Sequence, residues 1–121
     1  MTDLSKYLWD FERGQVGFHC PGCKTGHVIA IAADETRPGG PVWGYNGDPE
    51  APTFTPSILV RSSERLTEDE RRRVLAGEKI QHRPTVCHSF VTAGQIQFLS
   101  DCTHALAGQT VPLVEWPSWE E

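Results

Sequence analysis

The distribution of four cysteines is the feature that most constrains how this chain can fold. Cys20 and Cys23 form a CPGC loop, whereas Cys87 and Cys102 bound the segment CHSFVTAGQIQFLSDC far downstream. The two-residue spacing in CPGC lets both sulfur atoms face one metal ion, as in zinc-binding knuckles. The second pair of thiols can meet only where the chain between them folds back on itself.

The segment between Cys87 and Cys102 predicts a β-hairpin. Polar and apolar residues alternate on both sides of Ala93-Gly94, a dipeptide that can form a tight turn because glycine tolerates positive φ. If Thr92 pairs with Gln95 across this turn, Cys87 and Cys102 project from the same face of the hairpin. The downstream thiols are then placed together at its open end.

We therefore expect a zinc site where the CPGC loop and the hairpin meet. Cys20, Cys23 and Cys87 supply thiolates to it. The fourth ligand is Cys102 in our first interpretation and His104 in the alternative, because His104 follows Cys102 by two residues and can replace it. Both donor sets, Cys₄ and Cys₃His, are typical of structural zinc sites.

The CPGC loop itself is flanked by two predicted strands. Apolar residues alternate over 15–20, and the run over 27–32 is rich in valine, isoleucine and alanine, so the loop lies at the tip of a hairpin. This is half of a zinc-ribbon pattern. The predicted fold class is mainly β, a small α+β domain in which hairpins converge on a zinc-ribbon-like metal site.

The segment 62–84 is highly charged and predicts one short surface helix. Thr67 followed by Glu70 forms a capping box, and Gly77 can end the helix. The arginines at 71–73 are explained either by a solvated charged face or by docking on nucleic acid or an acidic protein.

Length and charge limit the remaining options. At 121 residues and 38% hydrophobic composition, we expect a single zinc-stabilised domain over 1–121. A net charge of −5 argues against nucleic acid and anionic membranes as partners. The first residues lack a signal-peptide pattern, and the longest apolar run, 28–33, is six residues long. We expect a soluble, cytoplasmic protein whose reduced thiols favour metal binding over disulfides; its oligomeric state is not predicted.

Aromatic residues stand out in two polar, proline-containing segments. Trp43, Tyr45 and Asn46 lie in a loop that can bind a protein partner, or whose rings can instead plug the edge of the core. Trp116 and Trp119 near the end of the chain can pack back on the sheet or be offered to a partner.

Three segments carry a resemblance to a known family. The motifs CPGC, WGYNGDPEAPTFTPSILV and CHSFVTAGQIQFLSDCTHALAGQTVPL resemble a family of short phage and prophage proteins of unknown function, often labelled ammonia monooxygenase. The resemblance implies a phage or prophage origin and a bacterial host cytoplasm, and it supplies no catalytic residues. The label does not fit, because a membrane copper monooxygenase needs spanning helices.

The expected function is that of a zinc-stabilised, noncatalytic interaction module with a host or phage protein as partner, since a closed four-ligand site leaves no open position for substrate. An alternative is a small zinc-dependent hydrolase that uses His88, Asp101 or His104. The hairpin opposes it by placing His88 and Asp101 on the face away from the thiols, where Asp101 would accept backbone hydrogen bonds in a turn. Thiol redox chemistry at the CPGC loop is a third hypothesis.

Overall fold

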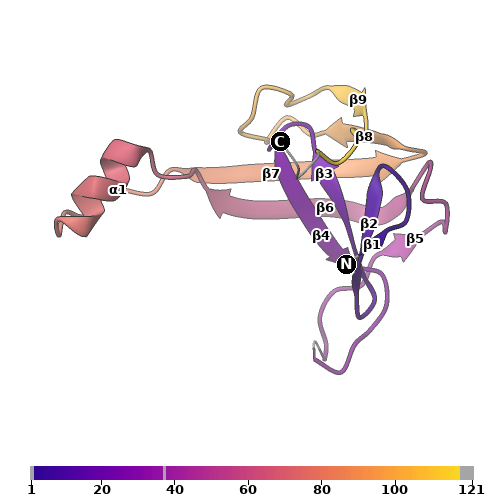
Figure 1. The fold of residues 1–121 in the computed structure, drawn as a ribbon. Coiled ribbons are helices and arrows are strands. Elements are labelled where there is room, and N and C mark those ends of the chain that lie inside the picture. Colours follow the sequence, from indigo (N-terminus) through magenta and orange to yellow (C-terminus); the bar gives the residue numbers. More distant parts are fainter. Residues whose placement is uncertain (1, 37, 118–121) are drawn as a thin grey trace.

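The computed structural model of this protein describes residues 2–36 and 38–117. These residues form two antiparallel sheets and one helix, so the predicted mainly β fold is confirmed. The first sheet has the order β1-β2-β3-β4 and the second has the order β5-β6-β7-β8-β9. In Figure 1 the strands of the first sheet cross the long strands β6 and β7 of the second.

The first sheet presents the CPGC knuckle, residues 20–23, at the end of a hairpin. Its strands are β1 (Thr2–Asp3), β2 (Leu8–Glu12), β3 (Gln15–Cys20) and β4 (Thr25–Ala30). The β3–β4 ladder closes with Cys20 opposite Thr25, and the Lys24 N–H donates to the Cys20 carbonyl oxygen at 2.8 Å. The knuckle is thus the turn itself, as the sequence predicts.

The second sheet contains the predicted hairpin. Its strands are β5 (Gly44–Tyr45), β6 (Phe54–Ser63), β7 (Pro84–Thr92), β8 (Gln95–Phe98) and β9 (Thr110–Pro112). Thr92 pairs with Gln95, which confirms the register, and Ala93 and Gly94 have φ of 49° and 80°. Positive φ at both central residues is what a two-residue hairpin turn of the favoured type requires.

The strand pairing of the hairpin ends before Cys102. Strand β8 ends at Phe98, and the chain then turns, with the Cys102 N–H donating to the Leu99 carbonyl oxygen at 3.2 Å. This turn lifts the following residues out of the ladder. Cys102 therefore reaches the buried side through a loop rather than through strand alternation.

The helix α1 (Glu68–Leu75) has the predicted capping box and contains no buried residue. Figure 1 shows it at the far end of β6 and β7, away from the two sheets. Arg83, just before β7, donates to both carboxylate oxygens of Glu70 at 2.8 and 2.9 Å, which ties the helix to the base of that strand. This interaction lowers the pKa of Glu70 to about 2.

The core lies between the two sheets. Phe18 of β3 stacks on Phe54 of β6, with ring centroids 6.3 Å apart. Its buried hydrophobic members include Leu8, Phe18, Phe54, Val91, Ile96 and Phe98. The sheets are therefore joined by aromatic and aliphatic packing, and side chains near that interface are shielded from water.

The C-terminal segment packs back on the first sheet. Trp116 stacks on Trp9 with centroids 5.0 Å apart, and its Nε1 donates to the Tyr7 carbonyl oxygen at 3.0 Å. Trp119 lies outside the described residues. None of the helices formed by the described residues has the length and apolar character needed to cross a membrane.

Candidate functional site

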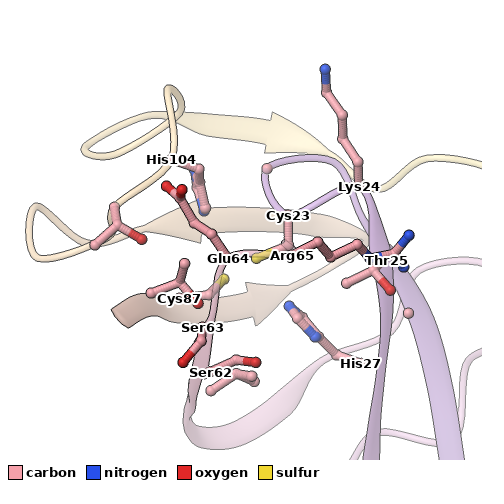
Figure 2. A pocket seen from close by; sticks show the side chains of 15 residues that line it. Cys23, Lys24, Thr25, His27, Ser62, Ser63, Glu64, Arg65, Cys87 and His104 are labelled. Atoms are coloured by element: carbon pink, nitrogen blue, oxygen red, sulfur yellow. The ribbon is translucent and has the colours of Figure 1, made fainter. Parts of the chain in front are cut away.

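Four side chains that could hold a metal ion meet between the two sheets. The ligand atoms of Cys20, Cys23, His27 and Cys87 all lie within 4.8 Å of one another, and we call this group the thiol cluster. Cys20 and Cys23 come from the knuckle, His27 from β4 and Cys87 from β7. Figure 2 shows the sulfur atoms of Cys23 and Cys87 directed toward each other, with the His27 ring beside them.

His27 is the member of the thiol cluster that the sequence analysis does not propose as a ligand. It is 6% exposed, and among the described side chains its Nε2 is a buried nitrogen without a hydrogen-bond partner. Buried polar atoms are nearly always paired, so a buried imidazole nitrogen without a hydrogen-bond partner beside three thiols has the environment expected of a metal ligand. The C-x₂-C-x₃-H spacing is the signal that would have found it.

The thiols of the cluster are electrostatically unequal. The Sγ atoms of Cys20 and Cys87 are 3.9 Å apart, and this hydrogen bond lowers the pKa of Cys20 and raises the pKa of Cys87. Burial raises the pKa of Cys23 to about 11. One thiolate is therefore stabilised by its neighbours, and a cation would favour loss of the other protons.

The two candidates for the fourth ligand lie next to this cluster. Cys87, Cys102 and His104 form a second group whose ligand atoms are within 4.8 Å of one another, so Cys87 belongs to both groups. Cys102 Sγ also contacts the backbone of His88, accepting from its N–H and donating to its carbonyl oxygen, both at 3.2 Å. The structure thus brings all five predicted metal residues into one region.

A cleft of about 710 Å³ opens beside the thiol cluster. Its walls come from the knuckle, from the end of β6 with the residues after it, and from His104, as Figure 2 shows. Cys23 lines the cleft and is only half-buried. The cleft therefore gives a metal ion an entry path to the cluster.

A second constellation occupies the opposite face of β7. His88 Nε2 lies 3.0 Å from Ser57 Oγ, and His88 Nδ1 lies 3.1 Å from Asp101 Oδ2. His88 and Asp101 lie away from the thiols, as expected from the hairpin register, but Asp101 was expected to accept hydrogen bonds from turn backbone. Asp101 instead contacts the imidazole, because the turn after β8 carries it toward β7.

Ser57 is presented by an irregularity in β6. The ladder pairs Phe54 with Val91 and then Ile58 with Ser89, so three residues of β6 face one residue of β7 between these pairs. Such bulges redirect side chains and are common next to active sites. The indole Nε1 of Trp43 donates to the Ser57 carbonyl oxygen at 3.2 Å, which anchors the bulge from the neighbouring loop.

The arrangement of Ser57, His88 and Asp101, which we call the triad, has the chemistry of a nucleophile, a base and an orienting carboxylate. The side chains of His88 and Asp101 are 27% and 55% exposed, so a substrate in solution can reach them. Their order along the chain is Ser, His, Asp. Triads are recognised by geometry rather than by sequence order, so Ser57 could not be identified from the sequence.

The predicted partner-binding loop makes internal contacts. Besides the Trp43 hydrogen bond, the Tyr45 ring stacks on Phe54 with centroids 5.3 Å apart. Asn46 Oδ1 accepts from the Thr53 N–H at 3.1 Å and so holds the loop closed. Partner binding by these residues stays a prediction.

Comparison with known proteins matches this chain to one protein family. A family model described as bacterial ubiquitination-like system serine protease (BubE) matches residues 4–99. No curated protein and no solved structure matches significantly. The family description contradicts the noncatalytic phage interaction module expected from the sequence. That expectation was wrong, because a metal site without an open position does not exclude a catalytic site elsewhere on the chain. The chain belongs to the BubE family of bacterial ubiquitination-like system serine proteases.

Proposed function

We propose that this protein is a serine protease in which Ser57 is the nucleophile, His88 the general base and Asp101 the orienting acid. The observation that carries the proposal is the pair of contacts to one imidazole, at 3.0 Å from Ser57 Oγ and 3.1 Å from Asp101 Oδ2. The family description supports it independently, since it names the same type of nucleophile.

The geometry supports a two-step acyl transfer. Ser57 Oγ attacks the carbonyl carbon of the scissile peptide bond while His88 Nε2 takes the hydroxyl proton. When the C–N bond breaks, His88 returns this proton to the leaving amine, and a water molecule then hydrolyses the Ser57 ester by the reverse sequence. Asp101 accepts the Nδ1–H of His88, which keeps Nε2 free to act as the base and stabilises the imidazolium that forms.

The substrate is expected to be a protein of a ubiquitination-like system, a proposal that rests on the family description. The open position of the triad on an exposed sheet face suits an extended chain segment better than a small molecule enclosed in a pocket. The protein partner expected from the sequence is therefore proposed to be the substrate of this protein.

Labelling with diisopropyl fluorophosphate tests the nucleophile. We expect the reagent to transfer its phosphoryl group to Ser57, located by mass spectrometry of the digested protein, and Ser57→Ala to abolish the reaction. Ser62→Ala is the matched control, since Ser62 is an exposed serine on the same strand. Labelling elsewhere, or labelling that persists in Ser57→Ala, would reject the triad.

We propose further that the ion held by the thiol cluster is Zn²⁺ and that its role is structural. Three thiolates and one imidazole would supply the four donors of a structural zinc site, a set that zinc favours and that would leave no open position for substrate. Zinc bound there would stabilise the domain by joining the knuckle of one sheet to β7 of the other. In this proposal the triad carries out catalysis, and the metal ion stabilises the fold.

Metal analysis of protein purified without added metal tests this assignment. We expect one zinc per chain, lost in His27→Ala and retained in His19→Ala, a control on the adjacent strand. Retention of zinc in His27→Ala would contradict the ligand set. A single domain over 1–121, the cytoplasm of a bacterium and a phage or prophage origin stay predictions that rest on the sequence alone.

A further inference from the structure

We infer that Cys102 is a positioning residue for the triad and not a metal ligand, an inference that rests on the proposed protease function. Its Sγ accepts a hydrogen bond from the His88 N–H and donates one to the His88 carbonyl oxygen, both at 3.2 Å. One side chain thus contacts both backbone groups of the general base, whose carbonyl oxygen also accepts from the Leu99 N–H at 2.9 Å. Cys102 is 8% exposed, so water competes little for these contacts.

The contact matters because Cys102 directly follows Asp101. Asp101 is more than half exposed and lies in a turn after β8, so packing does little to hold its carboxylate in place. Together with the Leu99 N–H, Cys102 ties that turn to the backbone of His88, whose ring Asp101 contacts. The next residue extends the attachment, since the Thr103 N–H donates to the Val86 carbonyl oxygen at 3.0 Å.

Metal ligation by Cys102 would compete with this role. A metal-bound sulfur has no hydrogen to offer to the His88 carbonyl oxygen, so the observed pair of contacts and ligation exclude each other. Cys102 shares the second group with Cys87 and His104, whereas Cys20, Cys23, His27 and Cys87 would already supply the four donors of a zinc ion without it. We therefore assign Cys20, Cys23 and Cys87 to metal binding and Cys102 to the positioning of His88.

Cys102→Ala and Cys102→Ser separate the two roles when diisopropyl fluorophosphate is the probe. In the probed reaction the Ser57 Oγ–P bond forms, the P–F bond breaks, fluoride leaves and the hydroxyl proton passes to His88. We expect Cys102→Ala to lower kinact, the maximal rate constant of inactivation, about 100-fold, because a misplacement of about 1 Å between reacting groups has an effect of this size. KI, the reagent concentration that gives half of this rate, should be unchanged. Serine can donate and accept in the same place, so Cys102→Ser should restore most of kinact.

Metal content is the second readout. Both variants should keep one zinc per chain, whereas a ligand role predicts loss of zinc in both, because a serine hydroxyl is a poor zinc ligand. Ile96→Val, a mild truncation in the same hairpin core, should leave both kinact and zinc unchanged. If Cys102→Ala does not fold, Cys102→Ser still decides, since zinc loss there would overturn the inference.

The outcomes separate this inference from the proposed function. Labelling of Ser57 in the unaltered protein together with an undiminished kinact in Cys102→Ala would overturn the positioning role alone. Failure to label Ser57 in the unaltered protein would overturn the protease and the positioning role together.

Discussion

Gly22 lies against the imidazole ring of His104, so closely that a Cβ at position 22 would overlap the ring atoms. Gly22 belongs to the knuckle of the first sheet, whereas His104 follows the turn that carries Asp101. The ring also packs edge-on against Phe98, with centroids 4.4 Å apart. His104 is therefore clamped between the knuckle and β8, and the knuckle supports the segment that bears the triad acid.

Replacing Gly22 tests this close approach. Gly22→Ala should displace the His104 ring and destabilise the protein by about 1–3 kcal/mol, the usual range for overpacking a filled site. Urea unfolding of the single variant, His104→Ala and the double variant measures the coupling. If the clash with the ring is the cause, the double variant should be less destabilised than the sum of the single changes. Strictly additive changes in unfolding free energy would show that the clash with His104 is not the cause.

Asp101→Asn should slow labelling of Ser57 with little effect on stability. An asparagine can hold the wrong imidazole tautomer, an effect of about 10⁴-fold for a buried triad aspartate. Because Asp101 is 55% exposed and solvent screens its charge, we expect a smaller loss, about 10²–10³-fold in kinact. Asp69→Asn on α1 is the remote control and should be unchanged.

Trp43→Phe should disturb the bulge without unfolding the chain. The variant loses the hydrogen bond from the indole to the Ser57 carbonyl oxygen, a loss of about 1 kcal/mol in the free energy of unfolding, and should also slow the labelling of Ser57. Tyr45→Phe in the adjoining strand β5 keeps the stacking on Phe54 and serves as the control. If the two variants have the same stability and the same rate of Ser57 labelling, the Trp43 hydrogen bond does not help to position the nucleophile.

Removal of the metal should loosen the whole domain. A structural zinc contributes apparent binding free energy of roughly 10–16 kcal/mol at pH 7, comparable to the total stability of a small domain. Calorimetry with a chelator, and of Cys23→Ser, should therefore show loss of the cooperative melt or a large fall in Tm. A melt that a chelator leaves unchanged would contradict the structural metal.

The helix α1 should lose a stabilising contact in acid. The hydrogen bonds from Arg83 lower the pKa of Glu70 from 4.5 to about 2 in the folded protein. Because the folded pKa is depressed, the stabilisation is fully present above about pH 4.5 and disappears as the pH falls toward 2. Carboxyl titration by NMR checks the value, and Glu70→Gln should abolish this acid dependence of the helix signal whereas Glu68→Gln should not.

Features encoded by neighbouring residues were predictable from the sequence. The turn at Ala93-Gly94, the capping box of Thr67 and Glu70, and the knuckle as a hairpin tip all depend on chemistry within a few residues. The expectation that Cys20, Cys23 and Cys87 meet rested on metal chemistry and the hairpin register, and the structure brings them together.

The triad was beyond such reasoning. Ser57 and His88 are 31 residues apart, and Ser57 faces His88 only because β6 is irregular before Ile58. No period in the sequence marks that irregularity. Asp101 similarly reaches His88 through a turn that follows the end of β8. Strand alternation alone therefore does not predict that Asp101 contacts the His88 ring.

Cys87 and His88 are neighbours on β7, yet one faces the thiol cluster and the other faces Ser57. Side chains on a strand alternate, so a slip of β7 by a single residue against β6 would turn both to the wrong side together. Such a chain would lose a metal ligand and its general base in the same event. If the proposed triad is catalytic, an incorrectly paired copy therefore has no proteolytic activity until β7 takes its correct register.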